Sequence, residues 1–288
     1  GKGIREDKRE AVKWYRLAAD QGNAEAQWRL GYCYYVGKGI REDKREAVKW
    51  YRLAAGQGNA EAQRRLGYCY YVGKGIREDK REAVKWYRLA AGQGNAEAQW
   101  RLGYCYFWGE GIREDKREAV KWYRLAADQG NAEAQRRLGY CYFWGEGIRE
   151  DKREAVKWYR LAADQGNAEA QRRLGYFYFW GKGIREDKRE AVKWYRLAAD
   201  QGNAEAQRWL GDCYFFGHGV GKNKREAVNW YFLSAEKGNA EAQRRLGACF
   251  YFGHGVAKNR QEAIRWYRLA AEQGNSVAIS MLKKLGVM

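Results

Sequence analysis

The side chains of this 288-residue sequence that could bind a ligand are arginines and aromatic residues at recurring spacings. Tyr68 follows Arg64 by four residues, and Tyr104 follows Trp100 at the same spacing. Arginine can donate two parallel hydrogen bonds to a carboxylate, and large rings supply much of the binding energy at interfaces. The pattern therefore favours non-covalent recognition. The residues that we predict to contact a ligand are Trp28, Arg64, Tyr68, Trp100, Tyr104, Trp108, Arg136, Tyr140, Trp144, Arg172, Tyr176, Trp180 and Arg208.

Candidates for metal or covalent chemistry are few. His218 and His254 stand in Gly-His-Gly turns, with no cysteine or second histidine at ligand spacing, so we predict exposed turn residues and no metal site. The stretch from Ser234 to Lys237 matches the Ser-x-x-Lys motif of penicillin-recognising enzymes, but neither companion motif is present. We interpret that match as coincidental. We predict a protein that is not an enzyme and that needs no cofactor.

The six cysteines all fall at one position of the pattern, and Phe177 takes that position in one copy. A phenylalanine stand-in indicates an apolar, packed role rather than redox or metal chemistry. Equivalent positions of stacked helices lie about 10 Å apart, beyond the ~7 Å limit for a disulfide. We therefore predict free thiols, which favour a reducing compartment, while the localisation stays open. The cysteines are Cys33, Cys69, Cys105, Cys141, Cys213 and Cys249.

Two helical patterns position these residues. Residues 60–72 predict a first helix, helix A, in which Ala62, Leu66 and Tyr70 form one stripe at spacings of four. Asn59 is placed to cap this helix, and Gly73 is placed to end it, because glycine tolerates positive φ. Residues 80–93 predict helix B, with an acidic capping box formed by Asp79 and Glu82. The predicted buried stripe of helix B is Ala83, Tyr87, Ala90 and Ala91, with Trp86 alongside.

Copies of this unit differ mainly in helix A. Counting Ala60 as position one, variation concentrates at positions five, nine, twelve and thirteen, whereas helix B is almost constant in the first six copies. These positions lie on one helical face with Glu61 at position two, away from the apolar stripe. The alternation of Arg and Trp at position five favours a binding role. At position thirteen, packing between neighbouring helices is an equally good interpretation.

A tryptophan of helix B marks the repeat by recurring every 36 residues. Neither helix can bury its stripe alone, but stacked copies bury a continuous core. The sequence therefore predicts an all-α fold, an α/α right-handed superhelical solenoid of helix-turn-helix repeats with a 36-residue period. We expect one domain over residues 1–288. It comprises a partial repeat with helix B only (1–22), seven A/B helix pairs (23–274) and a C-terminal capping helix (275–288). Because the sequence begins inside a repeat, we expect it to be part of a longer array.

The repeated motif, A-E-A-Q-x-x-L-G-x-x-Y-x-x-G-x-G-[IV]-x-x-D-x-x-x-A-x-x-W-Y-x-x-A-A-x-Q-G, resembles the Sel-1-like repeat, a relative of the tetratricopeptide repeat. The resemblance covers essentially the whole chain. It departs from the family in having no proline and only one cysteine per repeat. It implies an adaptor protein whose helix A face lines a concave groove for a peptide or protein. Recent tandem expansion and consensus design both account for the near-identity of the copies.

The chain carries a formal net charge of +19, with 55 Lys and Arg against 36 Asp and Glu. Part of this excess forms a ridge on helix B, for example at Arg81, Lys85 and Arg88. Such a ridge favours solubility, or else docking of a polyanion such as nucleic acid, anionic membrane or an acidic protein. We favour a protein or peptide partner with acidic and apolar residues over nucleic acid. No apolar run approaches the ~18 residues of a membrane span, and we expect a monomer.

Overall fold

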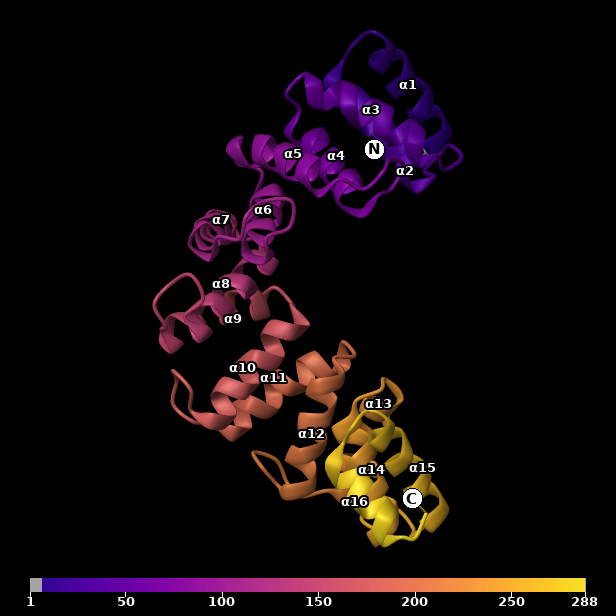
Figure 1. Cartoon of the computed structure of the whole chain (residues 1–288), viewed down its shortest axis with the longest axis vertical. Helices are drawn as coiled ribbons and strands as arrows, with labels where there is room; N and C mark the ends of the chain where they lie inside the picture. Colours follow the sequence, from indigo (N-terminus) through magenta and orange to yellow (C-terminus); the bar gives the residue numbers. More distant parts are fainter. Residues whose placement is uncertain (1–6, 288) are drawn as a thin grey trace, which may run out of the picture. The chain divides into compact units, whose positions relative to one another are not determined.

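The structure, a computed structural model, describes residues 7–287, which form sixteen helices and no strands (Figure 1). The connector that the sequence predicts before residue 7 lies outside the described residues. The helices are α1 (Lys8–Asp20), α2 (Ala24–Val36), α3 (Lys44–Gly56), α4 (Ala60–Val72), α5 (Lys80–Gly92), α6 (Ala96–Trp108), α7 (Lys116–Asp128), α8 (Ala132–Trp144), α9 (Lys152–Asp164), α10 (Ala168–Trp180), α11 (Lys188–Asp200), α12 (Ala204–Phe216), α13 (Lys224–Glu236), α14 (Ala240–Phe252), α15 (Arg260–Glu272) and α16 (Ser276–Lys284).

The chain forms two compact units, residues 1–150 and residues 151–288. Within each unit, every helix packs against the helices before and after it in the chain (Figure 1). Even-numbered helices up to α14 are A helices and odd-numbered helices are B helices, which confirms the all-α repeat fold. No helix in the described part is long and apolar enough to cross a bilayer.

The helix ends follow local sequence signals, with one exception. The Asn59 side chain accepts a hydrogen bond from the Ala62 N–H at the start of α4, and Gly73 ends that helix with a φ of 68°. Asp79 caps α5 by accepting from the N–H groups of Arg81 and Glu82. The predicted capping box is wrong in its second half. The Asp79 N–H donates to the Tyr70 carbonyl, and the Glu82 carboxylate binds Lys85 instead.

The core is built where an A helix meets the following B helix. The Tyr87 ring of α5 lies against Gly67 of α4, where an added Cβ would come within 2.8 Å of the ring. The stripes around this contact are buried as predicted, except that Cys69 rather than Tyr70 completes the stripe of α4. Tyr70 is half-buried, and its hydroxyl accepts a hydrogen bond from Arg52.

Buried glutamines join successive repeats. The Gln63 side chain donates to the Ala55 carbonyl and accepts from Gln93, 30 residues further on. The same link joins Gln27 to Gln57 and Gln99 to Gln129 in the first unit. The sequence analysis gave these glutamines no role. Because a buried polar group without a partner is unfavourable, each link fixes the spacing of two repeats as well as satisfying an amide.

We expect Gly67→Ala to destabilise the protein by about 1–3 kcal/mol, because the added methyl group must displace the Tyr87 ring in a closely packed core. The matched control is Gly92→Ala, because Gly92 is also helical but has no atom within 4 Å of an added Cβ. That change should be neutral or stabilising by up to ~1 kcal/mol, since alanine favours helix. Urea unfolding followed by circular dichroism measures both. Equal stability of the two variants would contradict the packing account.

The thiols should be inert in the folded protein. All six cysteines are buried and make no disulfide, and burial raises the pKa of Cys69, Cys105 and Cys141 to about 12. A disulfide reagent at pH 8 should therefore react slowly in native protein and rapidly in urea, since the thiolate is the nucleophile. Rapid native reaction of more than one thiol, followed by absorbance, would show that burial does not protect these groups.

Candidate functional site

Position five of the A helices makes the same hydrogen bond whether it is tryptophan or arginine. The Trp100 indole N–H donates to the Glu97 carboxylate at 2.7 Å, and Arg64 Nε donates to Glu61 at 2.9 Å. Trp28, Arg136, Arg172 and Arg208 donate to the equivalent glutamates of their own helices. The alternation that the sequence analysis used as a sign of ligand binding is therefore compatible with a constant local partner at position two.

The arginines at position five are mostly covered. Only 11% of the Arg64 side chain is exposed, and its guanidinium binds Glu61 through two nitrogens. Burial alone raises the pKa of Glu61, but the hydrogen bond and the charge of Arg64 outweigh it and hold that pKa below its usual value. A ligand would therefore meet most of this guanidinium as half of an ion pair.

Position six carries a residue that the sequence analysis missed. Arg101 of α6 lies over the Tyr68 ring of α4, with its guanidinium carbon 5.1 Å from the ring centre. Arg137 lies over Tyr104 in the same way, at 5.2 Å. The analysis looked for variation between copies, and position six is arginine in nearly all of them. These contacts hold the tyrosines of position nine between neighbouring A helices, which stabilises cation and ring together.

Rings of the first unit touch one another in a continuous row along the A helices. Trp100 meets Tyr104 at 6.2 Å, and Tyr104 meets Trp108 at 6.4 Å between ring centres. The row continues through Phe107, and its remaining contacts are Trp108–Phe107, Phe107–Tyr140 and Tyr140–Trp144. We call these six residues the aromatic row. Trp108 and Trp144, at position thirteen, remain 53% and 55% exposed, so packing within the protein covers only about half of each side chain.

Four of the predicted residues lie in the second unit. Trp180 is 50% exposed and packs against Phe179 and Trp209. Arg208 stacks on Trp209 at 3.8 Å, and Tyr176 packs against Phe177. Arg172 remains with its own Glu169. The structure therefore places these four predicted residues on A helices. Through Phe179 and His218, Trp180 also joins a run of ring contacts that continues to Phe216, Phe215, His254 and Phe252.

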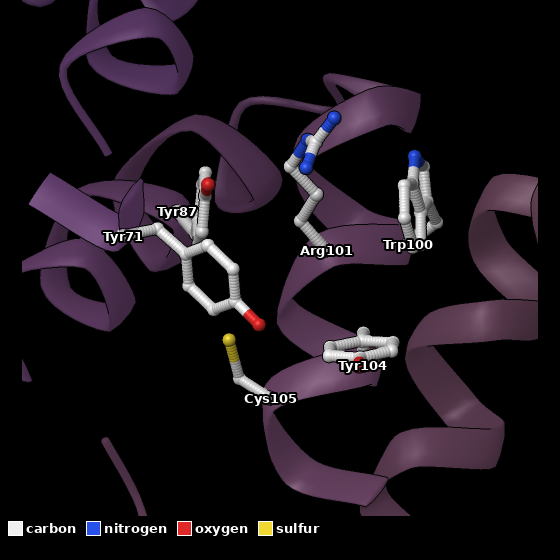
Figure 2. Close-up of a pocket in the computed structure, with 6 residues that line it drawn as sticks. All are labelled: Tyr71, Tyr87, Trp100, Arg101, Tyr104 and Cys105. Carbon is white, nitrogen blue, oxygen red and sulfur yellow. The ribbon is translucent and has the colours of Figure 1, made fainter. Parts of the chain in front are cut away.

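A pocket of about 260 Å³ lies beside the start of the aromatic row (Figure 2). Tyr71 of α4, Tyr87 of α5 and Arg101 of α6 line it together with Trp100, Tyr104 and Cys105. Figure 2 shows the Trp100 and Tyr104 rings along one wall, with Arg101 between them and Tyr87. The pocket therefore combines apolar walls with one guanidinium, a composition that suits an acidic side chain next to an apolar one.

The residues set aside as candidates for chemistry have structural partners. The Ser234 hydroxyl donates to the Ala204 carbonyl at 2.7 Å, and Lys237 Nζ donates to the Gly202 carbonyl. The prediction of exposed histidines is wrong, because His218 and His254 are half-buried and stack on Phe216 and Phe252. Within residues 7–287, no group of three or more His, Cys, Asp and Glu side chains could hold a metal ion.

Comparison with known proteins places this geometry among repeat proteins. The model of the Sel1 repeat matches residues 1–23, 24–59, 60–95, 96–131, 132–167, 168–203, 204–239 and 240–275. A protective antigen of uropathogenic Escherichia coli with an SLR fold is 40% identical, with a TM-score of 0.86 over 93% of this chain and 57% of the antigen. This chain thus spans less than two thirds of the antigen.

A Sel1 repeat protein from Oxalobacter formigenes is 34% identical, with a TM-score of 0.77 over 99% of this chain and 83% of that protein. No curated protein matches the sequence. Both proteins are repeat proteins of this kind, so the two structural likenesses agree with the fold described above.

We expect Glu61→Gln to destabilise the protein by about 1–3 kcal/mol, because it leaves Arg64 and Arg65 without their carboxylate. Glu82→Gln in the same repeat is the control. Among residues 7–287, Glu82 forms an ion pair with the exposed Lys85 alone, so its replacement should change the stability little. Thermal unfolding compares them.

The difference in stability between the wild type and Glu61→Gln should decrease as the pH falls. Because the folded-state pKa of Glu61 is lowered, its contribution is present above the unfolded pKa of about 4.3 and is lost as pH falls through the folded value. The gap between wild type and Glu61→Gln should therefore narrow in acid. A gap that stays constant down to pH 2 would contradict this.

Proposed function

The chain belongs to the Sel1 repeat family, and from that premise we propose that it is a non-catalytic scaffold that binds a peptide or protein segment along its helix A face. The repeat solenoid is a fold typical of protein–protein interaction scaffolds. The binding surface in this proposal is the aromatic row together with the pocket beside it. The second unit carries an aromatic surface of its own around Trp180 and Trp209.

The observation that carries the proposal is the exposure of the position-thirteen rings. Trp108 and Trp144 each keep about half their surface in solvent while their other faces pack against fixed neighbours. A rigid, half-exposed tryptophan gives a ligand a large contact area at little loss of conformational entropy, and such residues dominate binding energy. Leu125 of the B helix α7 is similarly exposed, at 48%, but it has no ring with which to make such contacts.

The charge of the protein supports an acidic and apolar partner. Its net charge of +19 would steer a segment containing Asp or Glu toward it. The aromatic row would then bury the apolar residues of that segment. The binding energy in this proposal comes from the rings, and the charge contributes mainly to the rate of association.

The non-catalytic part of the proposal rests on the fate of the only catalytic motif in the sequence. The Ser234 side chain is fully buried and its hydroxyl donates a hydrogen bond to a backbone carbonyl, while Lys237 donates one to a different carbonyl. A nucleophilic serine needs its hydroxyl within reach of a base and of substrate. The observed partners instead give both residues a structural role.

The basic ridge of helix B favours polyanion binding as a second candidate. Arg81 is exposed and offers a guanidinium to solvent, whereas Lys85 pairs with Glu82 and Arg88 donates to the Tyr106 hydroxyl. Only part of each ridge is therefore free to meet phosphate groups. Binding through this surface would weaken steeply with salt, because each phosphate contact releases counterions.

We expect Trp108→Ala and Trp144→Ala each to weaken a peptide selected from a displayed library by tenfold or more. The reason is that truncating a buried interface tryptophan costs about 2 kcal/mol or more. Leu125→Ala is the control, because Leu125 is 48% exposed but lies on the B helix α7. Fluorescence polarisation with the labelled peptide measures all three.

Neutralising Arg81, Lys85 and Arg88 together should leave that affinity nearly unchanged at physiological salt. Loss of binding in this ridge variant, with full affinity in both tryptophan variants, would overturn the groove proposal in favour of polyanion binding.

A further inference from the structure

Some tyrosines of the B helices carry buried hydroxyl groups without a well-placed hydrogen-bond partner. The Tyr51, Tyr87 and Tyr123 side chains of the first unit are at most 1% exposed, and within the described part none of their hydroxyls has a partner at ordinary hydrogen-bond geometry. A buried polar group left without a partner costs about 1–3 kcal/mol, and phenylalanine would fill the same space without that loss. The hydroxyls therefore call for a partner that the chain does not supply at these three places.

One of the equivalent tyrosines of the second unit shows what that partner can be. Tyr231 of α13 donates to Asp212 Oδ1 at 2.6 Å. Asp212 stands at position nine of α12, where the first-unit helices carry tyrosine, and its side chain is 8% exposed. Arg208 Nη1 donates to Asp212 Oδ2 at 2.9 Å, and Arg245 Nε lies 3.3 Å from Oδ1. A carboxylate is thus bound by one tyrosine and two arginines.

In the first unit, only Tyr87 has both equivalent arginines. Arg64 corresponds to Arg208, and Arg101 corresponds to Arg245. Around Tyr51 and Tyr123, the position of Arg208 is taken by Trp28 and Trp100. Each arginine near Tyr87 binds its own glutamate through Nε and Nη2, and within the described residues neither is paired with a second carboxylate. Nη1 is the donor that Arg208 gives to Asp212.

Tyr87 also lines the 260 Å³ pocket beside Arg101 (Figure 2). Trp100 stands in this pocket where Arg244 stands beside Tyr231, so the wall is apolar rather than charged. Burial raises the pKa of Tyr87, and the charges of Arg101 and Arg64 together with hydrogen bonding between Arg101 and the Tyr87 oxygen oppose that rise. Arg101 therefore lies close to the hydroxyl without meeting ordinary hydrogen-bond geometry. The Tyr68 ring fills the place of Asp212 and cannot itself supply a carboxylate.

We propose that this pocket binds the carboxylate of an Asp or Glu side chain from a peptide ligand, with Tyr87 and Arg101 as its donors and Trp100 and Tyr104 packing on an adjacent apolar residue. Asp212 is the chain's own copy of that ligand group. The inference rests on the proposed function. It adds that the protein recognises an acidic residue of the peptide, and that it does so in this pocket. Tyr87 accordingly keeps an unfavourable hydroxyl in the free protein because the hydroxyl is used in the complex.

The test compares two peptides that differ in charge but not in shape, acetyl-Gly-Phe-Asp-Gly-amide and acetyl-Gly-Phe-Asn-Gly-amide. Binding is followed by the indole N–H resonance of Trp100 in protein labelled with ¹⁵N-tryptophan. We expect the Asp peptide to bind at least about tenfold more tightly, because charge-assisted hydrogen bonds to arginine are about twice as strong as neutral ones. Equal affinity of the two peptides, or no binding of either at millimolar concentration, would overturn the proposal.

Two variants separate recognition from folding. Tyr87→Phe should reduce the preference for Asp over Asn at least threefold while leaving the melting temperature unchanged or higher. Its matched control, Tyr231→Phe, should lower the melting temperature by removing a donor to Asp212, and should leave the peptide preference intact. A Tyr87→Phe protein that melts lower and keeps full preference would show that the hydroxyl is structural only.

A third variant places a carboxylate of the protein itself beside Tyr87. Tyr68→Asp should block the Asp peptide, because it recreates the Asp212 arrangement beside Tyr87, whereas Tyr68→Asn should still bind it. Asp-peptide binding that survives Tyr68→Asp would count against the inference. Failure of the pocket leaves the wider proposal testable, because peptides selected on the aromatic row should still require Trp108 and Trp144. If the selected peptides bind both alanine variants with full affinity, the proposal that the helix A face binds the peptide would be wrong instead.

Discussion

Each repeat depends on one close contact, that of a helix B tyrosine ring with a helix A glycine. At Gly31, Gly67 and Gly103, an added Cβ would come within 2.8 Å of the ring. Because nothing larger than hydrogen fits there, the two helices approach closely and small residues such as alanine and cysteine complete the core. The same approach removes the tyrosine hydroxyl from water. A packing constraint thus creates a polar group that only a further partner can satisfy.

The buried polar groups of each repeat also depend on a neighbouring repeat for their hydrogen bonds. Each glutamine of an A helix needs an amide from the repeat that follows, as Gln63 does from Gln93. Where Lys237 replaces that second glutamine, Gln207 Oε1 is left without a partner and the lysine binds the Gly202 carbonyl instead. Near-identical copies therefore stabilise one another, and a substitution in one repeat is felt in the next. This restricts free variation to side chains that do not join repeats.

The helix A face combines such freedom with fixed electrostatics. Its glutamates at position two neutralise most of each arginine, so a ligand carboxylate cannot simply bind every exposed cation. An arginine of this face can offer a ligand a nitrogen that its own glutamate does not bind. The rings at position thirteen are half-exposed and can also contact the ligand. On the proposed function, selectivity would come from these leftover donors and affinity from the rings, which matches how interfaces generally divide the two roles.

The sequence alone determined the repeat, the helices and much of the core, because caps, glycine stops and apolar spacing are local signals. Residues 60–72 were predicted as helix A and form α4 without change, while helix B ends one residue before the predicted Gln93. The tertiary structure decided what the variable residues do. Arg64 was predicted to contact a ligand, and the structure adds that its guanidinium binds Glu61. His218 was predicted to be exposed, but it is half-buried and stacks on Phe216. The carboxylate beside Tyr231 comes from a neighbouring helix 19 residues away. Such contacts depend on how the helices pack against one another, and the spacing of residues along the chain does not predict that packing.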